Sequence, residues 1–155
     1  MNGHSAGNFA AFFQMMNAQR DTADFRETDA AVLRQFAEQF LPDRLPAEYL
    51  EFMRYAGNGL FWVGSDCNFQ SVPLLREWAE ELLTENSSPL SLPDDAFPFR
   101  MHQGYMFWFF RLSEGDDPPV YFYTEERPLT DFVRVSDSFT EFIVKYDGDR
   151  RTEPD

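Results

Sequence analysis

The chain has 155 residues, 43% of them apolar and 18 of them phenylalanine, which is enough apolar material for one independent hydrophobic core. Its formal net charge is −14 and Lys145 is the only lysine, which excludes the cationic footprint needed to hold nucleic acid or an anionic membrane. The charge favours a basic protein partner through electrostatic steering, although a role in solubility explains it equally well.

Sequence features also predict where the protein resides. Cys67 is the only cysteine, so neither an internal disulfide nor a cysteine zinc site can form, and a reducing compartment is compatible with the chain. No basic region precedes "NFAAFFQMM", and the longest apolar run, "YMFWFF" at residues 105–110, is too short to span a bilayer. These features predict a soluble, cytoplasmic protein without a membrane partner.

Residues 1–22 are predicted to form an N-terminal extension. Within it, "NFAAFFQMM" favours a short amphipathic helix packed on the domain, with an exposed hydrophobic arm as the alternative. Apolar residues at helical spacing then predict a helix from Asp24 to Phe40, with Asp24 and Glu27 as a capping pair. The two prolines of "LPDRLP" end that helix.

The stretch "LPAEYLEFMRYAGNG", residues 45–59, predicts the next helix. Pro46 suits its first turn, where no backbone N–H donor is needed, and its apolar residues share one face. Gly57, Asn58 and Gly59 tolerate a left-handed backbone, so they predict a C-cap and a tight turn. Because this turn follows a helix, whereas phosphate-binding loops precede one, it is not a phosphate cradle.

The second half of the chain is predicted to contain most of the sheet. "LFWVG" and "FQSV" are strand-like, and Pro73 then opens a third helix. "FPFRM", "GYMFWFFRL" and "VYFYTE" are predicted strands, "FVRVS" is a short edge strand, and Ser138 and Glu141 form the capping box of a last helix. This order predicts one α+β domain over residues 23–148, with a polar tail at 149–155. Its mixed or antiparallel sheet has about five to six strands flanked by helices.

Few residues are placed for catalysis or metal binding. The two histidines, His4 and His102, lie in a loose N-terminus and a predicted turn, with no nucleophile motif beside either. Neither HExxH, CxxC nor an EF-hand loop occurs, so no metal site and no cofactor are predicted. A pair of carboxylates acting as in glycosidases stays open, because sequence does not give their separation. Core packing explains "YMFWFF" better than stacking on RNA does.

The order of several motifs resembles the SUKH superfamily, the fold shared by bacterial toxin-immunity proteins and a fungal cell-wall-assembly regulator. "LPAEYLEFMRYAGNG" is similar to the family's helix followed by Asn-Gly, and "LPDDAFPFRMHQGYMFWFFRL" to its segment leading into the central strands. "DPPVYFYTEE" and "VSDSFTEFIVKY" resemble the later strand and the closing helix. The resemblance runs from Asp24 to Tyr146, while "GSDCNFQSV" and residues 1–22 have no clear counterpart in it.

The resemblance implies a SUKH-like α+β fold, no catalytic activity, and the binding and neutralisation of a cognate toxin domain, often a nuclease. An acidic inhibitor would suit the basic surface on which a nuclease holds phosphate. A regulatory scaffold that binds a host protein is an alternative from the same family, and a carboxylate-dependent hydrolase is one from another class. Charge and predicted exposure select the candidate partner contacts: Asp66, Glu77, Glu80, Glu81, Asp116, Asp117, Glu125 and Glu126.

Overall fold

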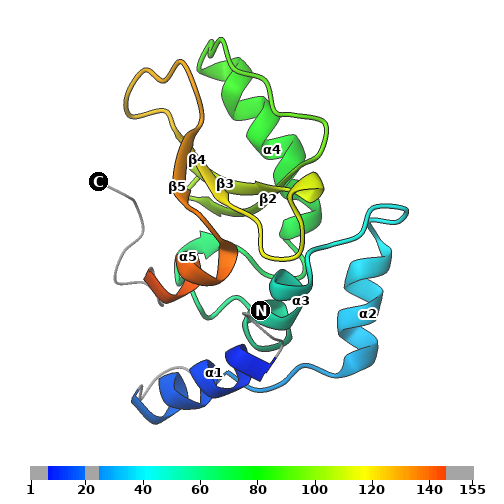
Figure 1. The fold of residues 1–155 in the computed structure, drawn as a ribbon. Helices are drawn as coiled ribbons and strands as arrows, with labels where there is room; N and C mark the ends of the chain where they lie inside the picture. The colour runs from blue at the N-terminus through cyan, green and yellow to red at the C-terminus, as the bar shows by residue number, and fades with distance from the viewer. Residues whose placement is uncertain (1–6, 20–24, 146–155) are drawn as a thin grey trace.

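Five strands pair in chain order, β1-β2-β3-β4-β5, and every neighbouring pair is antiparallel. The structure is a computed structural model that describes residues 7–19 and 25–145 (Figure 1). The strands are β1 (Ser65–Asp66), β2 (Ala96–His102), β3 (Met106–Arg111), β4 (Val120–Thr124) and β5 (Val133–Ser136). The helices are α1 (Gly7–Gln19), α2 (Ala30–Glu38), α3 (Ala47–Ala56), α4 (Val72–Glu85) and α5 (Phe139–Lys145), with a short 3-10 helix η1 (Leu112–Glu114). This arrangement confirms the predicted single α+β domain.

The hairpin of β2 and β3 forms the centre of the sheet. Gln103 and Gly104 turn the chain between the two strands with positive φ angles of 49° and 79°. The register shifts between Pro98 and Arg100, which is a β-bulge in β2. The bulge interrupts the alternation of side chains, and Phe99 and Arg100 therefore both contact the ring of Trp62.

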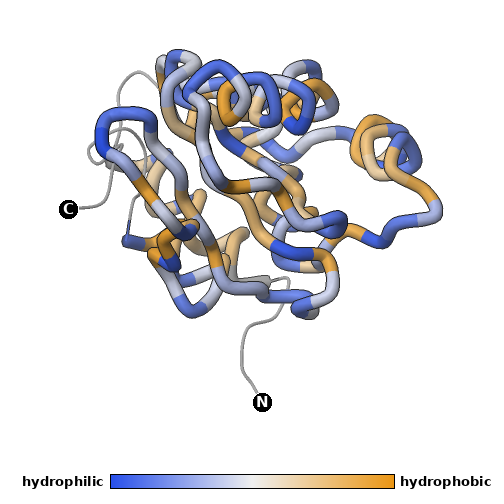
Figure 2. Tube along the Cα trace, turned by 90° about the horizontal axis from the view of Figure 1, so that it is seen from above, coloured by the Kyte–Doolittle hydropathy of each residue, from blue (hydrophilic) through white to orange (hydrophobic). Residues whose placement is uncertain are grey.

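Helices cover the sheet from two opposite sides (Figure 1). On one side, which we call the α3/α5 face, Tyr49 of α3 packs on Phe110, with ring centroids 5.1 Å apart. On the other side, which we call the α4 face, helix α4 packs along β2. Successive strand residues point to opposite faces, so the fully buried run 106–110 confirms that both faces are covered there. The hydrophilic stretches lie mainly in the outer turns (Figure 2).

Helix α1 adds a layer outside α3. Phe13 is buried and stacks on Tyr55 with ring centroids 5.1 Å apart, and Phe9 meets Phe52 edge-on at 5.9 Å. The side chain of Asn17, in the last turn of α1, binds the chain at Phe25: its Oδ1 accepts the backbone N–H of Phe25 at 2.7 Å. The described part of residues 1–22 is therefore a helix packed on the domain.

Helix α3 begins at Ala47, with Pro46 as its N-cap residue just before the first turn in which we expected it, and the glycine turn after the helix also differs from the prediction. Gly57 has a right-handed backbone with φ of −65°, and of the predicted turn only Gly59, at 89°, has positive φ. The reason for Gly57 is space, since a Cβ there would lie 2.1 Å from the ring of Phe69. The prediction of a left-handed turn is thus wrong at Gly57 and confirmed at Gly59.

The predicted start of the second helix is also wrong. Helix α2 begins at Ala30, because Asp29 caps it: Asp29 Oδ1 accepts the N–H of Ala31 at 2.8 Å. Asp24, which we expected to cap this helix, lies outside the described residues. A closer acidic residue at the true boundary therefore replaces the predicted capping pair.

The stretches "LFWVG" and "FQSV" do not form the predicted strands. Residues 61–64 are bends and turns, and only Ser65–Asp66 pairs with β2. Phe61 and Trp62 are nevertheless fully buried, which explains why the apolar pattern resembled a strand. The predicted polar tail at 149–155 lies outside the described residues.

Candidate functional site

Three of the predicted partner contacts lie on the exposed side of α4. Glu77, Glu80 and Glu81 are exposed, and together with Thr84 and Glu85 they line a shallow concavity of about 440 Å³. Glu80 Oε2 lies 3.1 Å from Arg76 Nε in an ion pair. Their placement follows from the helical period: Leu75, Ala79 and Leu82 take the buried stripe, and the acids fall on the opposite side.

Two more predicted contacts, Glu125 and Glu126, lie in the turn after β4. Residues 125–130 of this turn and residues 86–89 after α4 line a cavity of about 390 Å³. The hydroxyl of Thr124 accepts the N–H of Glu126 at 3.1 Å and orders the turn. The turn that carries both acids therefore lies beside the C-terminal end of α4, at one end of the molecule (Figure 1).

Asp116 and Asp117 hold helix ends on the far side of the sheet. Asp116 Oδ1 accepts the N–H of Ala47 at 3.0 Å, at the start of α3, where Pro46 offers no side-chain cap. Asp117 Oδ1 accepts the N–H of Thr140 at 2.8 Å, in the first turn of α5. The partners in these two contacts are 69 and 23 positions apart in the sequence, so helix-capping rules that use local spacing could not identify them.

Asp66 stands apart from the other predicted contacts. It is half-buried in β1, an edge strand, and pairs in register with Met101. The structure thus brings Glu77, Glu80 and Glu81 together on α4 and places Glu125 and Glu126 beside the segment that follows this helix, whereas Asp66, Asp116 and Asp117 lie elsewhere.

A serine–histidine contact lies at the pairing of β1 with β2. Ser65 Oγ lies 2.9 Å from His102 Nδ1 and accepts the Nε–H of Arg100 at 3.1 Å. The two residues are 37 positions apart, so no motif could indicate the pair. Because the hydroxyl oxygen already accepts from an arginine, the contact ties β1 to the sheet more than it prepares a nucleophile. His4 lies outside the described residues.

Arg100 is fully buried on the α3/α5 face. Its guanidinium carbon lies 4.5 Å from the centroid of Trp62 and 4.1 Å from that of Trp108. Burial lowers the pKa of Arg100 to about 9, because the folded protein desolvates the charged form. Neither terminal nitrogen has a hydrogen-bond partner among the described residues, so the two aromatic rings supply most of the stabilisation of this charge.

An aromatic pocket on the α4 face was missed by sequence reasoning. We call it the β3–β4 pocket; its volume is about 170 Å³, and it is lined by Pro93, Phe109, Arg111, Tyr121, Asp131 and Phe132. Phe109 and Tyr121 are cross-strand neighbours in register, and Phe132 covers them from the segment before β5. Only the alternation of aromatic residues along two strands signalled such a surface, and the register was needed to place them together.

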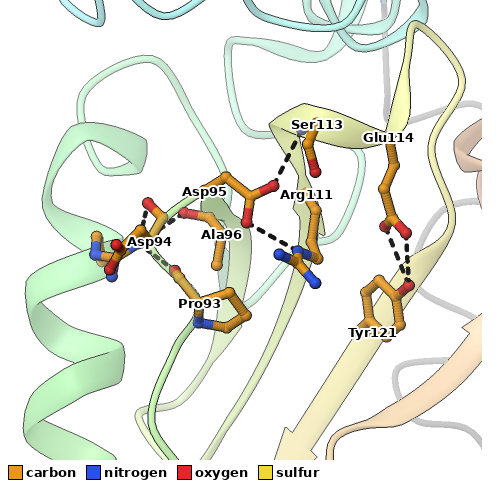
Figure 3. A network of polar contacts seen from close by, with 9 residues as sticks. Pro93, Asp94, Asp95, Ala96, Arg111, Ser113, Glu114 and Tyr121 are labelled. Atoms are coloured by element: carbon orange, nitrogen blue, oxygen red, sulfur yellow. Dashed lines mark hydrogen bonds and ion pairs between the residues drawn. The ribbon is translucent and has the colours of Figure 1, made fainter.

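A polar network borders this pocket (Figure 3). Asp95 accepts the Nε–H of Arg111 at 2.8 Å and the N–H of Ser113 at 3.1 Å. Burial alone would raise the pKa of Asp95, but the bonds from Ser113 and Arg111 outweigh it and hold the pKa below its ordinary value. Beside it, the Tyr121 hydroxyl donates to both carboxylate oxygens of Glu114, at 3.1 and 3.2 Å.

The described part of the chain contains neither a metal-binding cluster nor a candidate membrane-spanning helix. Within residues 7–19 and 25–145, no group of three or more His, Cys, Asp or Glu side chains is arranged to hold a metal ion. Across the same residues, no helix combines the length and apolar character needed to cross a bilayer.

The fold and these surfaces describe an α+β domain with an antiparallel sheet, an acidic helix on one face and a layer of helices on the other. The SMI1 / KNR4 family (SUKH-1) matches residues 28–145, more than half of the chain. The protein therefore belongs to this family, and membership fits an immunity-type or regulatory role. Comparisons with curated proteins and with solved structures gave no match. Helix α1 lies ahead of the matched residues.

Proposed function

We propose that this protein is a non-catalytic, immunity-type protein that binds a basic bacterial toxin domain and neutralises it by covering its active surface. The observation that carries the proposal is the acidic side of α4. Glu77, Glu81 and Glu85 are exposed there and form no ion pair with any described residue, so their charge is available to a partner. Membership of the family supports a protein partner.

The electrostatics of α4 explain how such a partner would be captured. Carboxylates on one helix side, with Glu125 and Glu126 at its end, produce a negative field that attracts a basic surface. A nuclease toxin holds phosphate with basic residues, so a complementary acidic protein can both meet that surface and block the substrate. The net charge of −14 adds long-range attraction to the local field.

Charge reversal tests the proposal with a matched control. The protein is co-expressed with the product of the toxin gene beside its own, and the complex is measured by surface plasmon resonance at several salt concentrations. The double variant Glu81→Lys/Glu85→Lys should lower the association rate by about tenfold or more and flatten its salt dependence. The control Glu38→Lys/Asp43→Lys makes the same change in net charge at exposed positions on and after α2, and should leave the rate nearly unchanged. Equal effects of the two variants would reject α4 as the contact.

A regulatory scaffold is the second candidate, since family membership fits that role too. Purification of the tagged protein from its own cells separates the two, because a scaffold would recover a host protein and an immunity protein would recover a toxin. The hydrolase alternative needs two partly buried carboxylates that face each other in a cleft. The carboxylates that line the cavities described above are all exposed, which does not favour this alternative.

A further inference from the structure

Three of the six residues that line the β3–β4 pocket are aromatic. Phe109 forms its floor and is 1% exposed. Tyr121 stacks beside it with ring centroids 5.3 Å apart at 24°, and Phe132 stands nearly perpendicular to it at 5.0 Å and 83°. The pocket therefore offers aromatic surfaces in two orientations, which suits a flat group that enters between them.

The charged groups around the pocket are unequally paired. Arg111 donates to Asp95 at 2.8 Å, and Arg134 lies 3.2 Å from Asp137, so each of these cations has a carboxylate partner. Asp131 also lines the pocket, but it is exposed and forms no ion pair with any residue that the structure describes. The mouth of the pocket thus carries one carboxylate whose charge is not balanced locally.

The size of the pocket limits what it can hold. Its volume of about 170 Å³ is below the roughly 300–1,000 Å³ of typical small-molecule sites. The space is closer to that of one long side chain. A side chain presented by a partner protein is therefore a better occupant than a free metabolite.

We propose that the β3–β4 pocket receives an arginine side chain of the basic partner, stacked against Tyr121 and Phe132 and paired with Asp131. A guanidinium is planar and weakly hydrated, stacks on aromatic faces, and pairs with a carboxylate through two parallel hydrogen bonds. The pocket supplies both of these partners. This inference rests on the proposed function, because it assumes a basic protein partner, and it assigns to that partner one anchoring residue.

Other occupants fit less well. An apolar side chain would bury Asp131 at the mouth without a partner, which costs free energy. A lysine would satisfy the charge, but its compact ammonium does not stack on rings in the manner of a guanidinium. An anion would have to compete with Asp95 for Arg111 and would meet Asp131 and Glu114 nearby.

The pocket can be tested without the partner. The intact protein is titrated with N-acetyl-arginine amide, followed by NMR chemical shifts, with N-acetyl-lysine amide and N-acetyl-leucine amide as comparison ligands. Saturable shifts confined to resonances around Phe109, Tyr121 and Phe132, strongest with the arginine amide, are expected. Unsaturable shifts, or equal shifts with the lysine or leucine amide, would overturn the assignment.

Variants identify the groups responsible. Asp131→Asn should weaken binding of the arginine amide by about tenfold, and Phe132→Leu should weaken it while leaving Asp131 in place. Asp43→Asn removes an exposed carboxylate elsewhere and should change nothing. Circular dichroism checks that each variant is folded. If one variant fails to fold, the other still tests the pocket, because the two substitutions are at different positions. Unchanged binding of the arginine amide in both pocket variants would show that the β3–β4 pocket is not its binding site.

The test separates this inference from the proposed function. If the protein binds no toxin, the titration still reports whether the pocket takes a guanidinium. If the protein binds a toxin and both Asp131→Asn and Phe132→Leu leave the dissociation rate of the complex unchanged, the immunity role stands and the anchoring arginine is wrong.

Discussion

Two arginines on neighbouring strands meet opposite surroundings. Arg100 of β2 is buried on the α3/α5 face, where its guanidinium lies between Trp62 and Trp108 and has no carboxylate partner in the part of the chain that the structure describes. Arg111 of β3 lies on the α4 face, with its side chain 41% exposed and paired with Asp95. The first face uses an arginine as a polarisable core residue. The second keeps its charges near water, where a partner can still reach them.

The α3/α5 face should be far more sensitive to the loss of an aromatic ring than the α4 face. Trp108→Ala removes a buried ring that contacts Arg100 and Phe122, and should lower the free energy of unfolding by about 3–5 kcal/mol. Phe132→Ala removes a half-buried ring from the β3–β4 pocket and should cost about 1–2 kcal/mol. Urea unfolding followed by tryptophan fluorescence and circular dichroism measures both. A thermal melt unchanged by Trp108→Ala would overturn the core assignment.

The same conservative substitution at the two arginines sharpens the comparison. Arg100→Lys loses stacking on two rings and the bond from Nε to Ser65, and buries a more strongly hydrated ammonium, so it should cost on the order of 2–3 kcal/mol. Arg111→Lys keeps an exposed charge next to Asp95 and should cost less than about 0.5 kcal/mol. Chemical denaturation of the two variants gives the difference, and equal losses would mean that the rings do not stabilise Arg100.

The elements that were predictable are those that local pattern determines. Apolar runs predicted β2, β3 and β4, and the Ser138–Glu141 spacing predicted the start of α5, where Ser138 Oγ accepts the N–H of Glu141 at 3.1 Å. The order of these elements along the chain then carried the family resemblance. Local signals were sufficient wherever the same few residues both specify and form the element.

The errors have a common physical cause, which is dependence on distant residues. Phe61 and Trp62 are apolar because a helix layer buries them, not because they form a strand. Gly57 is glycine because Phe69 lies against it, which no local rule reveals. The β3–β4 pocket joins two strands and a loop, so its residues could be placed together only after the register was known.

The carboxylate of Asp117, in the loop before β4, binds the start of helix α5 on the α3/α5 face. Asp117→Ala removes the acceptor of the Thr140 N–H at the start of α5 and should lower stability by about 1 kcal/mol, the usual cost of a lost cap. Asp137→Ala is the control, since that side chain is 85% exposed and its pair with Arg134 lies at the surface. Thermal unfolding at neutral pH compares them. A loss no larger than that of the control would show that Asp117 does not hold α5.

The last expected effect lies beside the β3–β4 pocket and depends on pH. Asp95→Asn removes the charge that Arg111 and Ser113 stabilise, and should lower the free energy of unfolding by at most about 1 kcal/mol at neutral pH. Because folding lowers the pKa of Asp95, this contribution is present above the ordinary carboxyl pKa of about 3.9 and is lost as the pH falls through the lower folded value. The difference between wild type and variant in urea unfolding should therefore shrink as the solution is acidified below about pH 4. A difference that stays constant would mean that hydrogen-bond geometry alone, and not the charge, makes Asp95 stabilising. In that case the stability of the α4 face would not depend on the charge pair of Asp95 and Arg111. Its contrast with the buried Arg100 would then have no electrostatic basis.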